Sequence, residues 1–314
     1  SLDALLRKAS SDRRVPATTA ARFAALVTLY PFLRGDLVVL ERGARHAAAL
    51  AERAGDHLLA ANAHKRLGYA LVEQRRPDEA TRHQDRALAA FRAAGDREGE
   101  AGMLNSIGRR LLYEARSHPD RYADARRYLL GSLAVARETG RGTAQVTALG
   151  NLGQLEHRAG RPDEARAYLT EALALSQKLG AAQLETVVAG SLGGVLADLG
   201  HHTEAVRQHE HALHVSRALA DRSRETVALH ELAETYLVAG LPELAADCAG
   251  RALDLHGRYG GPDAVEADVR VALGRALAAL GRRTEAREEW SRALAVLDAA
   301  DPVGAAEVRA LLSR

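Results

Sequence analysis

The densest local cluster of residues that could hold a metal ion or move a proton is one histidine-rich stretch. Five histidines fall close together: His201, His202, His209, His211 and His214. On a helix, His211 and His214 lie three residues apart and share a face, a spacing that two metal ligands can use. No cysteine or third aligned ligand completes such a site. The stretch is therefore interpreted as the polar outer face of a helix, and we predict no metal ion.

Other catalytic signatures are incomplete or missing. The segment from His230 to Glu234 approaches the His-Glu-x-x-His pattern of zinc proteases but lacks its second histidine. No glycine-rich stretch is followed by Lys-Ser or Lys-Thr, and no serine sits in a recognisable nucleophile elbow. The single cysteine, Cys248, excludes an internal disulfide and is interpreted as a small buried side chain. The sequence predicts a protein that is not an enzyme and has no cofactor.

The composition narrows the range of partners. Lys and Arg number 43 and Asp and Glu 41, so the net charge of +2 gives no reason to expect nucleic acid or an anionic membrane. Aromatic residues make up 4% of the chain, too few for the stacking platforms of single-strand binders. No window of about 18 residues is continuously apolar, and the N-terminus lacks the order of a signal peptide. We expect a cytoplasmic protein without direct contact to nucleic acid or membrane.

The elements that position these side chains follow from an internal repeat of about 40 residues. An apolar residue followed by a small one recurs at Leu67-Gly68, Ile107-Gly108, Leu152-Gly153, Leu192-Gly193, Leu232-Ala233 and Leu273-Gly274. An alanine follows in each copy at Ala80, Ala125, Ala165, Ala205, Ala245 and Ala286. Seven residues further stands a second small residue before a leucine, as in Ala172-Leu173. One copy carries five extra residues around 117–120, which predict a projecting loop.

Each copy predicts two helices of about 16 residues, because glycine ends the first helix and Pro, Asp or Thr opens the second, as in residues 160–163. Small residues at the recurring positions let the two helices approach closely. We expect one all-α domain over residues 1–314, a right-handed α-α superhelix of about seven helix pairs and a terminal half-repeat. The predicted copies are 16–55, 56–95, 96–140, 141–180, 181–220, 221–260 and 261–300, with a capping helix over 301–314.

This pattern resembles the tetratricopeptide repeat family, in a long form of about 40 residues instead of the usual 34 or so. The resemblance implies a protein-interaction module that binds a protein or peptide in a concave groove lined by the first helix of each pair. The groove-facing positions are counted from the small residue of each copy. The candidate ligand contacts are Lys65, Arg66, Tyr69, Asn105, Arg109, Asn151, Gln154, His157, Arg158, His230, Glu231 and Glu234.

The candidate wall changes character along the chain. Basic and amide groups from Lys65 to His157 suit an extended peptide held by its backbone or by acidic side chains. Gly190 and Gly194 leave the next section almost bare, and the section after that is acidic. Leu112 is expected on the same wall.

Copies that end in Ala-Leu-x-x-x-Arg-x-x-Gly-Asp, as at residues 87–96, resemble the C-terminal repeat regions of actinobacterial STAND-type transcriptional regulators. These include the Streptomyces antibiotic regulatory proteins. In that family the repeats act as a sensor and autoinhibitory arm behind a DNA-binding domain and a nucleotide-switch ATPase. The resemblance implies a regulatory region whose partners include such upstream domains. A freestanding scaffold, or a receptor for a quorum-sensing peptide, is the alternative that the sequence leaves open.

Overall fold

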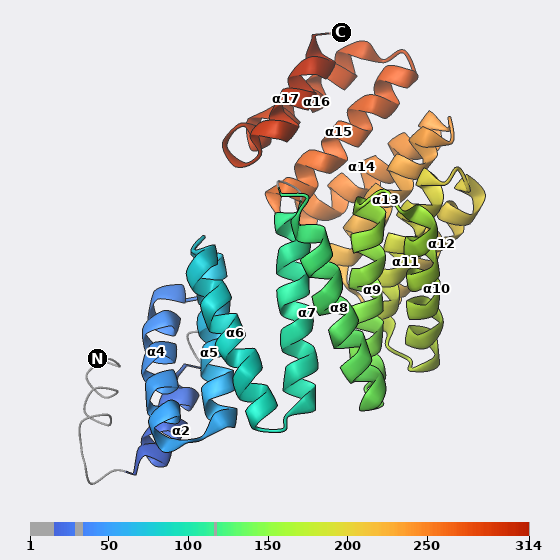
Figure 1. Cartoon of the computed structure of the whole chain (residues 1–314). Coiled ribbons are helices and arrows are strands. Elements are labelled where there is room, and N and C mark those ends of the chain that lie inside the picture. The colour runs from blue at the N-terminus through green and yellow to red at the C-terminus, as the bar shows by residue number, and fades with distance from the viewer. Residues whose placement is uncertain (1–15, 29–33, 116–117, 314) are drawn as a thin grey trace. The chain divides into compact units, whose positions relative to one another are not determined.

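The computed structural model describes residues 16–28, 34–115 and 118–313, which form α-helices joined by short turns, with no β-strand among them (Figure 1). The helices are α2 (Ala17–Val27), α4 (Leu37–Ala54), α5 (His57–Glu73), α6 (Pro77–Ala93), α7 (Arg97–Glu114), α8 (Arg121–Glu138), α9 (Gly142–Arg158), α10 (Pro162–Lys178), α11 (Ala182–Asp198), α12 (His202–Ala218), α13 (Arg222–Val238), α14 (Pro242–Tyr259), α15 (Asp263–Ala279), α16 (Arg283–Ala300) and α17 (Pro302–Leu312). The predicted pairs correspond to α2 with α4 through α15 with α16, and α17 is the terminal half-repeat. The all-α solenoid predicted from the repeat is confirmed.

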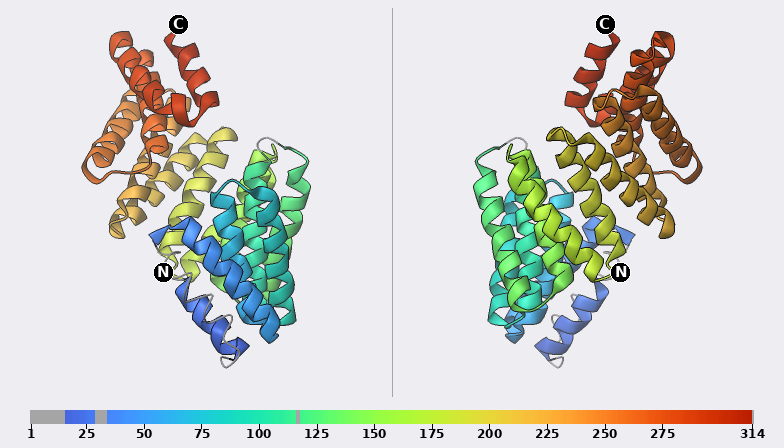
Figure 2. Two further views of the ribbon diagram at one scale, coloured as in Figure 1. Left: turned by 90° about the vertical axis from the view of Figure 1, so that its left-hand side faces the viewer. Right: turned by 90° about the vertical axis from the view of Figure 1, so that its right-hand side faces the viewer.

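The helices fall into two compact units, which we call unit 1 (residues 1–148) and unit 2 (residues 149–314). Within each unit, consecutive helices of a pair lie side by side and antiparallel, as α7 and α8 do in both views of Figure 2. The boundary falls inside α9. The expectation of a single domain stays a prediction.

The helix ends follow the turn chemistry of the sequence. Asp56 caps the N-terminus of α5, and its carboxylate accepts a hydrogen bond from the backbone N–H of Leu59 at 2.9 Å. Pro162 occupies the first turn of α10, where its missing N–H has no intrahelical partner to lose. Gly55 ends α4 with a φ of 67°, a conformation that glycine adopts without a Cβ clash. Local residues therefore set the breaks of the array.

The two helices of each pair approach closely at two facing positions whose side chains are complementary in size. A Cβ on Gly153 would lie 2.4 Å from Cγ of Leu169, sixteen residues later on the partner helix. Gly274 faces Trp290 and Gly193 faces His209 in the same way. In one pair both positions are alanines, Ala233 and Ala249, and both are fully buried. We call each such set a size-matched pair: where one helix carries glycine, its partner carries a large side chain.

Neighbouring repeats are joined across their turns by hydrogen bonds that span eight residues. Arg92 donates through Nε to Glu100 at 2.8 Å, and Arg217 donates in the same way to Glu225 at 2.8 Å. Burial raises the pKa of Glu225, but hydrogen bonds from Arg217 and Arg222 outweigh it and lower the pKa overall. The glutamate stays charged and links the end of one pair to the start of the next.

The predicted projecting loop lies partly outside the described residues, which omit 116 and 117. Residues 118–120 form a turn that leads into α8.

Candidate functional site

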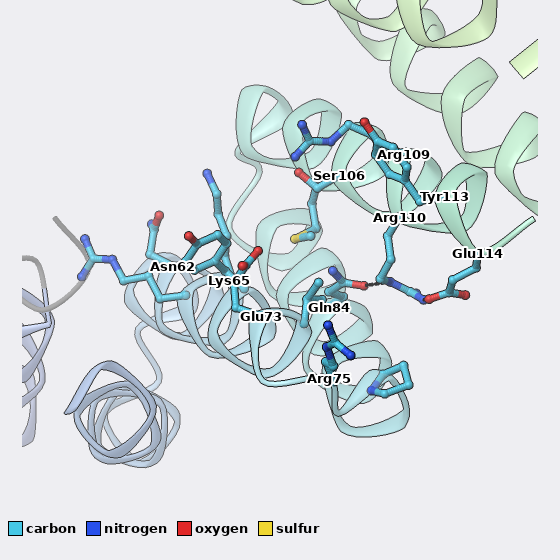
Figure 3. Close-up of a pocket in the computed structure, with 15 residues that line it drawn as sticks. Asn62, Lys65, Glu73, Arg75, Gln84, Ser106, Arg109, Arg110, Tyr113 and Glu114 are labelled. Atoms are coloured by element: carbon cyan, nitrogen blue, oxygen red, sulfur yellow. Dashed lines mark hydrogen bonds and ion pairs between the residues drawn. The ribbon is translucent and has the colours of Figure 1, made fainter. Parts of the chain in front are cut away.

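Unit 1 contains a cavity of about 860 Å³ lined by the first helices of two consecutive pairs. It brings together four of the predicted contacts, with Lys65, Arg66 and Tyr69 on α5 and Arg109 on α7. Figure 3 shows Asn62 and Lys65 on one ribbon and Ser106, Arg109 and Tyr113 on the other, with Gln84 between them.

Gln84 reaches this cavity from α6, because it is the large member of the size-matched pair of Gly68. It is 5% exposed, and its Oε1 accepts a hydrogen bond from Nε of Arg110 at 2.8 Å (Figure 3). Arg110 also donates to Glu114 at 2.6 Å. Arg110 is thereby held at the wall by two partners.

Three other cations that line the cavity have no such partner. Among the residues that the structure describes, Lys65, Arg75 and Arg109 form no ion pair. Lys65 and Arg109 are exposed, so their charges face solvent and any ligand in the cavity. The lining contains more Lys and Arg side chains than carboxylates, of which it has two, Glu73 and Glu114, so the cavity carries an excess of positive charge.

Arg75 stands in an uncommon backbone conformation, with a φ of 58°. The corresponding turns of later repeats have glycine there, as at Gly160, Gly200 and Gly240. A left-handed conformation costs a residue with a Cβ about 1–2 kcal/mol. The arginine therefore occupies this position at some expense to stability.

Arg66 is engaged outside the cavity. Its Nη1 donates to the backbone oxygen of Ala25 and to Oγ1 of Thr28, each at 2.6 Å. Burial of the guanidinium lowers the pKa of Arg66. The side chain fastens α5 to the C-terminal end of α2, where a cation is favoured by the helix dipole.

The cavity also has an apolar part, for which the sequence predicted the residue before the one that lines it. Leu112, expected on this wall, is 1% exposed and packs inside the unit. The next residue, Tyr113, is 56% exposed and lines the cavity together with Tyr69, Val72 and Met103. A helix turns 100° per residue, so counting four residues from Gly108 reaches the buried flank and counting five reaches the open one.

Unit 2 contains a smaller cavity of about 380 Å³, which we call the α11 cavity. Its lining includes six of the predicted contacts: Gln154, His157 and Arg158 on α9, and His230, Glu231 and Glu234 on α13. Between these helices, α11 contributes Gly190 and Gly194, which leave the space open. Asp198, which the sequence did not suggest, accepts a hydrogen bond from Nε2 of His157 at 2.6 Å.

The two remaining predicted contacts lie elsewhere. Asn105 lines a shallower hollow of unit 1, beside Asn62 and Thr143. Asn151 is half-buried on α9, about one turn before Gln154.

The interpretation of the histidine-rich stretch as a polar outer face is wrong for His209. This residue is 1% exposed, because it is the large member of a size-matched pair and its ring lies beneath Gly193. His201 and His214 are exposed, as predicted. Nε2 of His211 contacts the Glu185 carboxylate at 2.6 Å. No three metal-binding side chains come together anywhere in the described part of the chain.

The repeats match known sequence families. Residues 114–178 and residues 188–223 each match a family model described as tetratricopeptide repeat. The chain therefore contains tetratricopeptide repeats. No curated protein sequence is detectably similar to it. None of the described helices combines the length and the apolar character needed to cross a membrane.

Several solved structures share the fold. The apo form of RapI has a TM-score of 0.69 and 15% identity, over 88% of this chain and 97% of that one. A Rap protein complexed with competence and sporulation factor has a TM-score of 0.61 and 16% identity, over 88% of this chain and 75% of that one.

A third similar structure is a signal transduction ATPase with numerous domains and a tetratricopeptide repeat sensor, from Pyrococcus horikoshii. It has a TM-score of 0.63 and 16% identity, over 98% of this chain and 48% of that one. The chain thus spans about half the length of that protein. At these identities the likeness shows the fold alone.

Proposed function

We propose that this chain is a non-catalytic module that binds an acidic segment of a peptide or protein in the cavity of unit 1. The observation that carries the proposal is the set of three cations, Lys65, Arg75 and Arg109, without an ion-pair partner among the described residues. Tetratricopeptide repeats generally serve interactions, which supports a binding role. The cavity volume of about 860 Å³ is within the range of ligand sites and suits a few residues of an extended chain.

The lining favours a ligand with both charged and apolar groups. A carboxylate that accepts hydrogen bonds from Lys65 or Arg109 would gain about 1.5–3 kcal/mol per bond. Tyr69 and Tyr113 offer exposed rings against which an apolar or aromatic side chain can pack. An acidic segment interrupted by apolar residues satisfies both.

Charge reversal tests the site directly. We expect the Lys65→Glu/Arg109→Glu variant to weaken binding of fluorescein-labelled acidic heptapeptides, selected from a random library, by about 100-fold. The control variant, Arg82→Glu/Lys178→Glu, makes the same change in net charge at exposed positions on second helices. It should bind as the unmodified protein does. Circular dichroism checks that both variants keep their helices.

The opposite results would end the proposal. If the library yields no acidic peptides, or if both double variants lose affinity equally, the cavity is not the site. Replacing Glu by Gln in the selected peptide separates recognition of charge from recognition of shape.

We further propose that the module is the sensor or regulatory region of a larger cytoplasmic transcriptional regulator. The STAND protein from Pyrococcus horikoshii supports this, because its match covers 98% of this chain. The Rap structures support the alternative, a freestanding scaffold or peptide receptor, since the chain covers 97% of RapI. The upstream coding sequence decides: a nucleotide-switch ATPase and a DNA-binding domain favour the regulator, and their absence favours the alternative.

A further inference from the structure

The α11 cavity has an open centre because α11 carries two glycines, Gly190 and Gly194, on the face that lines it. The position of Gly190 is also glycine in α9, but the position of Gly194 carries a side chain in the other first helices of the six clear copies. A Cβ on Gly190 would lie 2.6 Å from Oε2 of Glu231. The Glu231 carboxylate therefore lies over the backbone of α11, in space that any larger residue would fill. Gly194 is one turn further along the same helix, with nothing within 4 Å of the position that its Cβ would take.

Directly beneath this carboxylate lies an unsatisfied buried histidine. His209 is 1% exposed and lines the cavity, and its Nδ1 is 3.3 Å from Oε2 of Glu231. Within the described part of the chain, Nδ1 of His209 has no hydrogen-bond partner. Buried polar atoms are almost always paired in native proteins, so a buried Nδ1 whose nearest charged atom is Oε2 of Glu231 is unusual.

The other charged groups of the cavity have partners. Asp198 accepts from His157 at 2.6 Å, and Glu234 contacts Arg275 at 3.4 Å. Arg158 has interactions of its own. The Glu231 carboxylate differs, because its one contact with a charged or titratable group among the described residues is the His209 ring.

We propose that the α11 cavity is a second binding site, which takes the guanidinium of an arginine side chain from the bound peptide or protein. A guanidinium carries five N–H donors in one plane. It can donate to Nδ1 of His209 in its neutral form and to the Glu231 carboxylate at the same time, and it neutralises the carboxylate's charge. The volume of about 380 Å³ holds one long side chain, with Val238 exposed at the rim for its aliphatic stem.

This inference rests on the proposed interaction role but not on the cavity of unit 1. The two sites favour ligand groups of opposite charge, and they lie in different units. Each can therefore fail without the other.

The test compares two blocked peptides that differ in charge and hardly in shape. Acetyl-Gly-Arg-Gly-amide should bind, and acetyl-Gly-citrulline-Gly-amide, whose planar urea group keeps three of the five N–H donors and lacks the charge, should bind at least about tenfold more weakly. Binding is followed by calorimetry and by the NMR signals of the imidazole of His209 in protein labelled at histidine. The arginine peptide should shift those signals to saturation.

Variants of the protein assign the contacts. Glu231→Gln keeps the shape of the side chain and should lower affinity for the arginine peptide by about tenfold or more. His209→Leu copies the leucine found beneath Gly153 and should lower it by about five- to tenfold, since the ring acceptor is lost while the packing is kept. The control, Glu204→Gln, changes an exposed carboxylate of α12 and should have no effect.

Four outcomes would overturn the proposal. Equal binding of the arginine and citrulline peptides would show that charge is not recognised. Unmoved His209 signals, or an unchanged affinity in Glu231→Gln, would show that any binding occurs elsewhere. If agmatine, a free guanidinium compound, binds far more tightly than the peptide, the site serves a small molecule and not a peptide side chain. Loss of acidic-peptide binding in Lys65→Glu/Arg109→Glu, by contrast, tests only the site of unit 1.

Discussion

The size-matched pairs predict that a Gly→Ala substitution lowers the free energy of unfolding when the partner side chain is large and raises it when the partner side chain is small. In the unmodified protein, Gly153→Ala places a Cβ 2.4 Å from Cγ and 2.8 Å from Cδ2 of Leu169, which is fully buried. Overpacking of this kind costs about 1–3 kcal/mol, and the better helix propensity of alanine returns about 1 kcal/mol. We expect a net loss of about 1 kcal/mol in the free energy of unfolding.

With Leu169→Ala in the background, the same change should stabilise. Leu169→Ala alone leaves a cavity and costs about 2–5 kcal/mol. Adding Gly153→Ala then causes no clash, fills part of the cavity and keeps the gain in helix propensity of about 1 kcal/mol. The double variant recreates the pair that the chain already has at Ala233 and Ala249, both fully buried.

Urea unfolding followed by far-UV circular dichroism measures the four members of this double-mutant cycle. We expect a coupling free energy of about 2 kcal/mol in favour of the double variant. Gly150→Ala is the control on the same helix, because its Cβ would meet only Val188, at an ordinary 3.7 Å. It should stabilise by about 1 kcal/mol in either background. Equal effects of Gly153→Ala in both backgrounds would refute the size-matching argument.

Two further predictions concern unit 1. Arg75→Gly should raise the free energy of unfolding by about 1 kcal/mol, since glycine adopts a φ of 58° without strain, yet weaken binding of the acidic peptide. Calorimetry and peptide titration measure the two effects, and a variant improved in both would contradict a ligand role for Arg75. Burial and the stacked ring of His64, whose Nδ1 is 3.0 Å away, lower the pKa of His83 from 6.5 to about 4. The unfolded chain therefore binds more protons between about pH 6.5 and 4, and stability present above that window is lost as the pH falls through it. Solvent screening of this partly exposed ring reduces the loss to about 1–2 kcal/mol. His83→Gln should flatten the dependence of urea midpoint on pH across that window, and an unchanged slope would count against this account.

The sequence predicted the array well because its signals are local. Glycine and proline fix the helix ends within a few residues, and the recurring small residue marks where two helices touch. The step of sixteen residues from Gly153 to Leu169 follows from the same frame, once the helices are known to be antiparallel. The same step of sixteen residues leads from Gly193 to His209 and predicts that His209 is buried between the two helices. The histidine-rich composition of the stretch alone suggested an exposed face.

The candidate sites were less predictable, because they depend on contacts between distant segments. Arg66 lies at a groove-facing position, yet its hydrogen bonds go to Ala25 and Thr28, about forty residues earlier. Leu112 is buried whereas Tyr113, the next residue, lines the cavity. These two positions differ by a single step of about 100° of helical rotation, and a family pattern does not locate a groove-facing residue that finely. Whether a cation has an ion-pair partner cannot be read from its position in a repeat.

The size-matched positions connect the packing of the array to recognition. Leu169 fills its position with apolar groups, as stability alone would favour, and Trp290 pairs its one polar atom, Nε1, with the backbone oxygen of Val271 at 3.3 Å. Gln84 and His209 put polar atoms in the equivalent buried places, and each of these two side chains is part of the lining of a cavity. Gln84 uses its oxygen to hold Arg110 at the wall, whereas Nδ1 of His209 remains without a partner in the described structure. Burying a polar group where leucine would fit lowers stability unless a hydrogen bond compensates, and at His209 the compensating donor would come from the ligand.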